Sequence, residues 1–321
     1  MSSPIGAEAT TQATPIRNNK RNLLVRLKNQ TTLQIMALLG LAWMIIFNYI
    51  PMYGISIAFK QYIGIGDISK APWVGWEHFK ALFEDEEIGY VIKNTLGMSL
   101  LKLIVGFPLP IIFALFLNEL RSLRYKRIVQ TISYLPHFLS WVILGGILIT
   151  WLADVGIVND VLMGLGIINE PIFYLSEPKY FWSIVITSDI WKELGWSAII
   201  YIAAIAGVSP ELYEAATIDG AGRFQRMRYV TLPGISGTIS ILFILAVSSI
   251  LNSNFDQIFI LKNQVNETAA QVVDTYVYQV GISQGRFSYS TAVGLVKSII
   301  AVILLLIANS VSKRLNQSSL F

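Results

Sequence analysis

A short group of charged and aromatic residues interrupts the long apolar segment 181–208. The group is Asp189, Trp191, Lys192, Glu193 and Trp196. On a helix, Asp189 and Glu193 stand one turn apart on the same face, and Lys192 is three residues from Asp189. Charged side chains inside a membrane helix are costly and usually functional. The spacing predicts a solute pathway in which tryptophan stacks on a ring and the charged groups bind hydroxyls.

The same residues have a second interpretation. Lys192 can pair with acids on its own helix, while Trp191 and Trp196 anchor the helix at the membrane interface. Lys102 and Lys297 lie within two other apolar runs. Each either faces a cavity, where it would suit a carboxylate, or pairs with an acid of the group to hold helices together. The sequence alone leaves both interpretations open.

Asn254 and Asp256 follow the fifth apolar run and are further candidates. They are expected to meet either a solute in the pathway or a protein docked on the outer face. An ordinary helix terminus explains the two residues equally well.

The sequence contains no recognisable catalytic set. It has no cysteine, which excludes a thiolate nucleophile. It has no Gly-x-x-x-x-Gly-Lys-Ser/Thr loop to hold nucleotide phosphates. His78 and His137 are far apart without a ligand-spaced partner, so we expect no metal site and no bound cofactor. The net charge is only +4, and no nucleic-acid partner is expected.

The elements that must position these residues are membrane helices. Of 321 residues, 54% are hydrophobic and 14% charged, with a mean hydropathy of +0.57. A soluble domain has about 25% charged residues. Six runs are long enough to cross about 30 Å of hydrocarbon, and each must be helical because lipid offers backbone amides no partner. The runs are 32–53, 91–118, 128–152, 181–208, 235–251 and 289–311.

Basic residues predict the orientation of these helices. Lys and Arg cluster in the N-terminal segment, at 121–127, at 223–228 and at 313–314, whereas the other loops are longer and acidic. The positive-inside rule places the basic segments and both termini in the cytoplasm. We therefore expect a flexible basic tail at 1–31, one membrane domain at 32–311 and a short tail at 312–321. The acidic run 84–87 is expected to be a solvated outer loop, or a docking point for a basic surface.

The polar inner loop 209–233 lies between the fourth and fifth runs. Ser209 before Pro210 suits the start of a helix, and the glycine-bearing turn 219–222 suits its end. A second short helix is expected at 224–230. The loop is therefore predicted to be a helix–turn–helix along the inner membrane face, with small residues that let another protein approach closely.

The residues of this loop also resemble a known motif. The motif is Glu-Ala-Ala, three residues, Gly, nine residues, Ile, one residue, Leu-Pro, found in the coupling loop of binding-protein-dependent ABC importer permeases. The matching residues are Glu214, Ala215, Ala216, Gly220, Leu232 and Pro233. Val230 replaces the Ile. The resemblance implies a type I ABC importer permease fold, in which these residues and Asp219 couple the permease to an ATPase.

Other stretches resemble one branch of that family, the permeases for oligosaccharides derived from polysaccharides such as alginate and rhamnogalacturonan. They are 47–60, 94–96, 118–119, 134–140 and 254–259. The resemblance implies import of neutral or acidic oligosaccharides by alternating access through the bacterial inner membrane. It further implies a second permease as heterodimer partner, an ATPase dimer that holds ATP and Mg inside the cell, and a solute-binding protein outside.

The alternative is a secondary transporter or channel that works alone, because intramembrane Lys, Asp and Glu also occur in such proteins. An internal hydropathy repeat would favour it, and the sequence has no clear one. A membrane-embedded enzyme ranks last, since the sequence offers no catalytic set.

Overall fold

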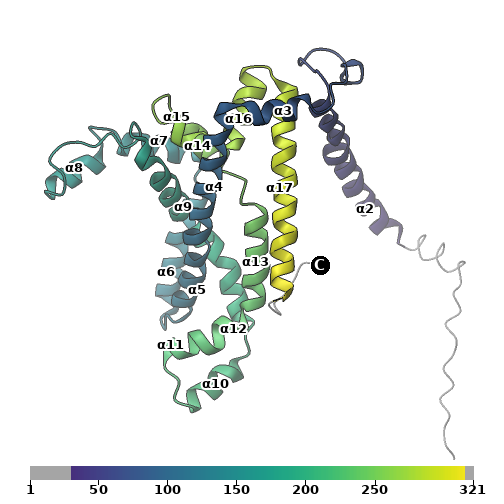
Figure 1. The fold of residues 1–321 in the computed structure, drawn as a ribbon. Helices are drawn as coiled ribbons and strands as arrows, with labels where there is room; N and C mark the ends of the chain where they lie inside the picture. The colour runs from purple at the N-terminus through teal and green to yellow at the C-terminus, as the bar shows by residue number, and fades with distance from the viewer. Residues whose placement is uncertain (1–29, 315–321) are drawn as a thin grey trace, which may run out of the picture. The chain divides into compact units, whose positions relative to one another are not determined.

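The computed structural model describes residues 30–314, which are almost entirely helical (Figure 1). The structure is 77% helix and has no strand in this part of the chain, which confirms the predicted all-α class. The predicted tail 1–31 lies almost wholly outside the described residues, as does most of the predicted tail 312–321. The chain divides into two units, Met1–Gly54 and Ile55–Phe321, which are described separately.

In the first unit, helix α2 (Thr31–Met44) continues as a π-helical turn, η1 (Ile45–Tyr49), and then enters the 3-10 helix η2 (Ile50–Phe59). No residue of α2 or η1 is buried, although both are strongly apolar. A helix that is apolar on all sides suits a lipid environment. The predicted run 32–53 therefore lies within one continuous helical segment, Thr31–Phe59.

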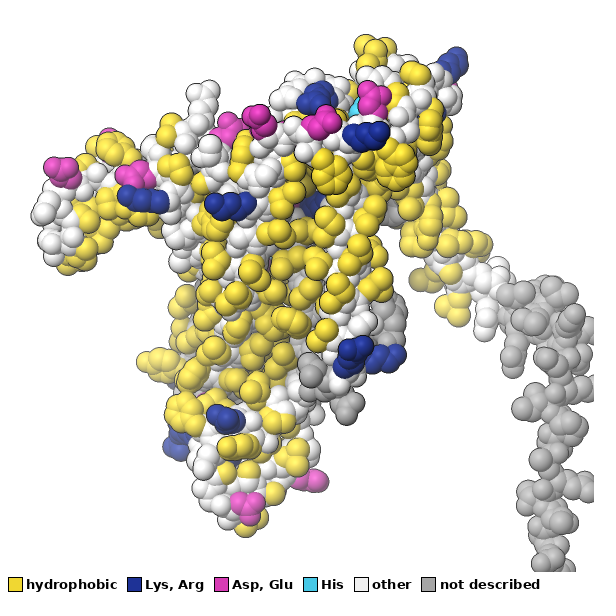
Figure 2. Space-filling view, in the orientation of Figure 1, with side chains coloured by type: hydrophobic (Ala, Val, Ile, Leu, Met, Phe, Trp, Pro, Cys, Tyr) yellow, Lys and Arg dark blue, Asp and Glu magenta, His cyan; other side chains and the backbone are white. Residues whose placement is uncertain are grey.

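Four long helical segments form the bundle of the second unit. Helix α4 (Glu86–Gly106) continues as α5 (Pro108–Asn118), and α9 (Pro178–Ala206), α13 (Ser236–Ser248) and α17 (Phe287–Arg314) run beside them (Figure 1). Buried apolar side chains join α5 to α9 and α13, and others join α4 to α9. Figure 2 shows a band of hydrophobic side chains across the middle of this bundle, with charged side chains above and below. Such a band suits contact with a bilayer.

Shorter helices cap the two ends of the bundle. Helices α3, α14, α15 and α16 lie at one end, and α10, α11 and α12 lie at the other (Figure 1). The bounds of the shorter elements are η3 (Ile68–Lys70), α3 (Glu77–Glu84), α6 (Leu123–Tyr134), η4 (Leu135–Phe138), α7 (Trp141–Trp151), α8 (Ile157–Gly164), α10 (Pro210–Ile218), α11 (Arg223–Arg226), η5 (Met227–Thr231), α12 (Leu232–Gly234), α14 (Phe255–Leu261), α15 (Glu267–Ala270), α16 (Val273–Tyr278) and η6 (Gln279–Ser283).

The number of membrane crossings depends on how bent helices are treated. Among the described residues, three helical segments are long and apolar enough to cross a membrane, and up to six are if each bent pair is one span. The bends are 96° between α6–η4 and α7, 73° between α9 and α10, and 64° between α11–α12 and α13. Six crossings, and an orientation with both termini inside, therefore remain predictions.

The third apolar run differs from the single helix that the sequence predicts. Pro136 lacks an N–H group and disturbs the helix at η4. The Ser140 hydroxyl then accepts a hydrogen bond from Ile143 N–H at 3.3 Å and begins α7 in a new direction. The third run is therefore two helices that meet at a 96° bend after Pro136.

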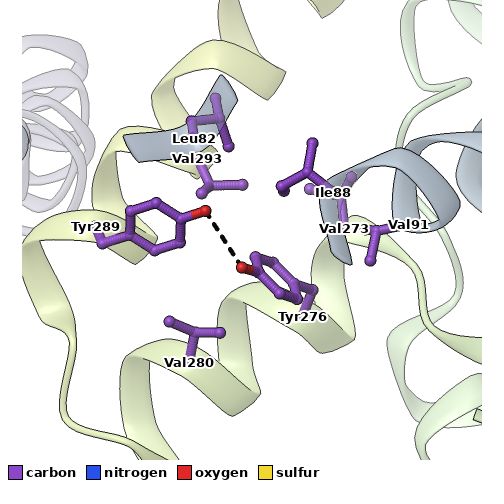
Figure 3. Packing of buried hydrophobic residues seen from close by; sticks show 8 residues of the cluster. All are labelled: Leu82, Ile88, Val91, Val273, Tyr276, Val280, Tyr289 and Val293. Atoms are coloured by element: carbon purple, nitrogen blue, oxygen red, sulfur yellow. Dashed lines mark hydrogen bonds between the residues drawn. The ribbon is translucent and has the colours of Figure 1, made fainter. Parts of the chain in front are cut away.

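The end of the bundle that carries α3 and α16 has a small core of its own (Figure 3). Its buried residues are Leu82, Ile88, Val91, Val273, Tyr276, Val280, Tyr289 and Val293. The Asp85 carboxylate accepts hydrogen bonds from the hydroxyls of Tyr276 at 2.5 Å and Tyr289 at 2.7 Å, and from Glu87 N–H at 2.9 Å. These bonds tie the start of α4 to α16 and α17. The acidic run 84–87 is thus not simply a solvated loop, because Asp85 belongs to a packed network.

Candidate functional site

A cavity of about 550 Å³ lies among α4, α5, α9 and α13. Most of its lining is apolar, and the polar and charged side chains are concentrated on α4, on α9 and beyond α13. They are Ser99, Lys102, Asp189, Glu193, Trp196, Ser197, Tyr201, Ser249 and Asn252. An apolar hollow with a few convergent polar groups has the usual character of a small-molecule site. We call it the central cavity.

An ion pair bridges α4 and α9 in the wall of the central cavity. Lys102 Nζ lies 2.8 Å from Asp189 Oδ2, and the Asn254 side-chain amide donates to Asp189 Oδ1 at 3.4 Å. Of the alternatives for Lys102 that the sequence left open, the structure supports both, because this lysine faces the cavity and also pairs with an acid of the group. The pair holds two helices together where lipid and cavity offer little other polar contact.

Lys192 points away from the central cavity. Its side chain is buried, and Nζ donates to the His137 carbonyl at 2.7 Å and lies 3.0 Å from Glu193 Oε1. His137 Nδ1 lies 2.7 Å from Glu193 Oε2. These contacts fasten α9 to η4, the turn at the break in the third run. Lys192 therefore supports the wall rather than facing the cavity.

The two tryptophans of the group have different surroundings. Trp196 lines the central cavity, and its ring stacks on His137 with centroids 4.2 Å apart and an interplanar angle of 2°. Phe138 meets the same ring edge-on. Trp191 is exposed and does not line the cavity. The stacked position suits Trp196 for contact with a sugar ring, whereas Trp191 suits the alternative of an interface anchor.

The remaining predicted residues lie further out. Asn254 reaches the cavity wall through Asp189, while Asp256 is exposed and does not line the cavity. Lys297 forms its ion pair with Asp274 rather than with Asp189 or Glu193, and Ser253 N–H donates to the same carboxylate at 3.0 Å. Lys297 is therefore a structural cation outside the central cavity.

His137 was missed as a member of this site. Sequence reasoning considered it only as a metal ligand, and the described residues contain no group of His, Asp and Glu that could hold a metal ion. Its contacts with Lys192, Glu193 and Trp196 arise because the break at Pro136 turns η4 toward α9. Pro136 beside His137 was the available signal, but the sequence does not say which helix the turn meets.

The loop 209–233 is a helix–turn–helix at the opposite end of the bundle from α3 (Figure 1). Helix α10 begins after Ser209, whose side chain makes no capping hydrogen bond. It ends in a Schellman motif, in which Ala221 N–H donates to the Ala216 carbonyl at 2.8 Å and Gly220 N–H to the Thr217 carbonyl at 3.1 Å. Gly220 has φ +78°, a conformation that glycine adopts without strain. The predicted turn at 219–222 is therefore where the sequence placed it.

Two side-chain contacts hold α10 against the second arm of the loop. The hydroxyls of Tyr213 and Thr231 lie 3.0 Å apart, and Arg226 Nη1 donates to Thr217 Oγ1 at 3.2 Å. The expected second helix, 224–230, is present as α11 followed by the π-helical turn η5. The loop therefore has a defined shape.

The outer surface of the loop is open to a partner. The motif residues Glu214, Ala215, Asp219, Gly220, Leu232 and Pro233 are exposed, and Ala216 is half-buried. Several large apolar side chains of the loop are exposed with them, namely Leu212, Ile218, Phe224 and Tyr229. Exposed apolar groups gathered on one surface mark a site of contact with another protein or with a membrane.

Residues 106–318 match the family described as the binding-protein-dependent transport system inner membrane component. This chain belongs to that family. The permease is 43% identical over 299 residues to Protein LplB of Bacillus subtilis (strain 168), a match that covers 93% of each chain. It is 41% identical over 308 residues to the polygalacturonan/rhamnogalacturonan transport system permease protein YteP of the same organism, with 95% of each chain covered.

Two solved structures are also similar to the permease. One is from a bacterial ABC transporter involved in the import of the acidic polysaccharide alginate, with TM-score 0.84, 40% identity, and 91% of this chain and 99% of that chain covered. The other is from the bacterial alginate ABC transporter in complex with an alginate pentasaccharide-bound periplasmic protein, with TM-score 0.86, 39% identity, and coverage of 93% and 100%.

These similarities confirm the type I importer permease fold that the loop motif implied. The permease is a multi-pass component of an inner membrane and belongs with the permeases of sugar and oligosaccharide uptake. It is a transport subunit and not an enzyme.

Proposed function

We propose that this permease is one of two transmembrane subunits of an ATP-driven importer, and that it moves acidic, polysaccharide-derived oligosaccharides into the cytoplasm. In this proposal a second permease completes the pathway, a solute-binding protein delivers the cargo outside, and an ATPase dimer binds ATP and Mg inside. This chain itself holds neither the nucleotide nor the metal. The loop 209–233 binds the ATPase, and the central cavity lines the route of the sugar.

The observation that carries the proposal is the direct connection of the loop to the cavity wall. Helix α9 supplies Asp189, Glu193 and Trp196 to the central cavity and then passes into α10 across a 73° bend. Beyond the loop, α12 leads into α13, which lines the other side of the cavity. A displacement of the loop would therefore move both cavity helices. This geometry suits alternating access, in which nucleotide binding shifts the population between two arrangements.

The substrate class rests on two kinds of support. YteP is a permease of polygalacturonan and rhamnogalacturonan transport, and the structural relatives come from alginate transporters. In the central cavity, Trp196 offers a ring for stacking, serine and asparagine side chains offer hydrogen bonds to hydroxyls, and Lys102 offers a positive charge. A polyhydroxylated anion fits this set of groups.

The test is uptake into liposomes that contain this chain, its second permease and the ATPase, with ATP inside and the binding protein outside. We expect Glu214→Lys to lower uptake by about tenfold or more, because it reverses a charge on the proposed docking surface. We expect Gly220→Ala to lower it several-fold. The added Cβ meets no atom within 4 Å, so its effect arises only from the φ of +78°.

The matched control is Glu170→Lys, an equal charge reversal at an exposed acid on the loop after α8, which should leave uptake unchanged. ATP-driven uptake that survives both loop substitutions in correctly assembled complexes would contradict the proposal. Gradient-driven uptake by liposomes that hold this chain alone would instead support a stand-alone transporter.

A further inference from the structure

The charged side chains around the central cavity form ion pairs with one another. Among the described residues, Lys102 is the only cation that lines the cavity, and Asp189 and Glu193 are the only acids. Glu193 is bound by Lys192 and His137 on its far side. The cavity wall therefore contains one pair, Lys102 with Asp189, whose two members both face the route of the sugar.

The two members of this pair differ in their freedom to move. The Lys102 side chain is 35% exposed, whereas the Asp189 side chain is 9% exposed. Lys102 ends a flexible four-carbon chain, and its Nζ has three donors that can turn to a new acceptor. Asp189 is held in place and keeps a second donor, the Asn254 amide, when Lys102 leaves. Lys102 can therefore move to another acceptor while Asp189 keeps a hydrogen bond from the Asn254 amide.

We propose that Lys102 binds a carboxylate of the sugar chain in the central cavity, and that Asp189 is the resting partner that this carboxylate replaces. The inference rests on the proposed function, and it assigns recognition of one acidic sugar unit to a single side chain. An unpaired charged lysine within the membrane is energetically costly. Asp189 therefore neutralises Lys102 when no sugar is bound. When the sugar is bound, its carboxylate takes the place of Asp189 as the negatively charged partner of Lys102.

The exchange predicts opposite effects for the two partners. Lys102→Met removes the cation, so transport of an acidic sugar should fall by roughly 10- to 100-fold, the range expected for a lost hydrogen bond to a charged group. Asp189→Asn removes the competitor for Lys102, so the KM for the same sugar should fall. A pair that only holds α4 against α9 would be damaged equally by either substitution.

The experiment uses the complete importer in liposomes, with tetragalacturonate and its fully methyl-esterified derivative as probes. Methylation removes the negative charge while keeping the sugar chain. We expect Lys102→Met to lose uptake of the acid but to keep uptake of the ester within about twofold of the wild type. Lys102→Arg should retain most uptake of the acid, because the charge remains.

Lys297→Met is the matched control, since Lys297 also pairs with an aspartate, Asp274, but does not line the cavity. It should not change the ratio of acid to ester uptake. Equal loss of acid and ester in Lys102→Met, or no loss of either, would overturn the inference while leaving ATP-driven import intact. A wild-type importer that takes up neither probe with ATP would overturn both the proposed function and the inference that rests on it.

Discussion

Among single residues, Asp85 shows how one carboxylate holds together the small core at the end of the bundle that carries α3 and α16. Partial burial raises its pKa, but hydrogen bonds from the hydroxyls of Tyr276 and Tyr289 and from Glu87 N–H outweigh that effect. The nearby Arg286 guanidinium acts in the same direction. The net result is a pKa below the usual 3.8 of an aspartate. The ionised form is therefore the one that the folded structure prefers.

A depressed pKa predicts how stability depends on pH. The contribution of Asp85 should be fully present above its unfolded pKa of 3.8 and should be lost as the pH falls through the lower folded value. Asp85→Asn should accordingly lower the melting temperature of the purified permease at pH 7 and have little effect at the lowest pH it tolerates. Thermal unfolding in detergent across this range measures the difference. Glu86→Gln, an exposed neighbour, is the control, and an equal loss at both pH values would contradict the prediction.

Single residues were also where sequence reasoning met its limits. The spacing of Asp189 and Glu193 placed both on one helix face, and both line the central cavity. The partner of Lys102 was left open because it lies 87 positions away on another helix, and periodicity within one helix carries no information on such contacts. The direction of Lys192 was undetermined for the same reason.

At the scale of elements, long uninterrupted apolar runs were the easiest to predict. The fourth and sixth runs appear as the continuous helices α9 and α17, because their sequences offer no competing turn. The third run was predicted as one helix and is two, since the effect of Pro136 depends on the neighbours that receive the freed backbone. The fifth run, expected at 235–251, ends early, with α13 finishing at Ser248.

The crossing of α6 and α9 depends on Gly195. A Cβ added there would lie 2.2 Å from the Ser133 carbonyl oxygen, so the helix backbones are in direct contact. We expect Gly195→Ala to force the helices apart and to destabilise the permease by about 1–3 kcal/mol, the usual cost of overpacking. Gly146→Ala on α7, where the added Cβ meets nothing within 4 Å, is the control and should be neutral or slightly stabilising. Thermal unfolding of the two variants compares them, and equal melting temperatures would show that the crossing is loose.

In the whole molecule, α9 connects two features, because its residues from Asp189 to Tyr201 line the central cavity and its C-terminal end leads into the loop 209–233. The central cavity is built by side chains that face one another within the membrane, and the loop 209–233 presents an exposed surface beyond it. The loop motif identified the family from sequence, because all of its residues lie within one short stretch of the chain and their spacing can be read without knowing any tertiary contact. The cavity could not be predicted in the same way, since it is formed by four helices whose packing no local pattern specifies.

The proposed coupling is tested most directly by finding on which side of the membrane residue 214 lies and which protein it contacts. The chain has no cysteine, so Glu214→Cys creates a single attachment point for a photoreactive maleimide. In membranes that hold the complete importer, we expect this position to resist a membrane-impermeant maleimide added outside and to cross-link to the ATPase. A cysteine at the exposed residue Asn169, beyond α8, should show the reverse. Labelling of residue 214 from outside, or no ATPase adduct in assembled complexes, would contradict the proposal that the loop 209–233 binds the ATPase inside the cell.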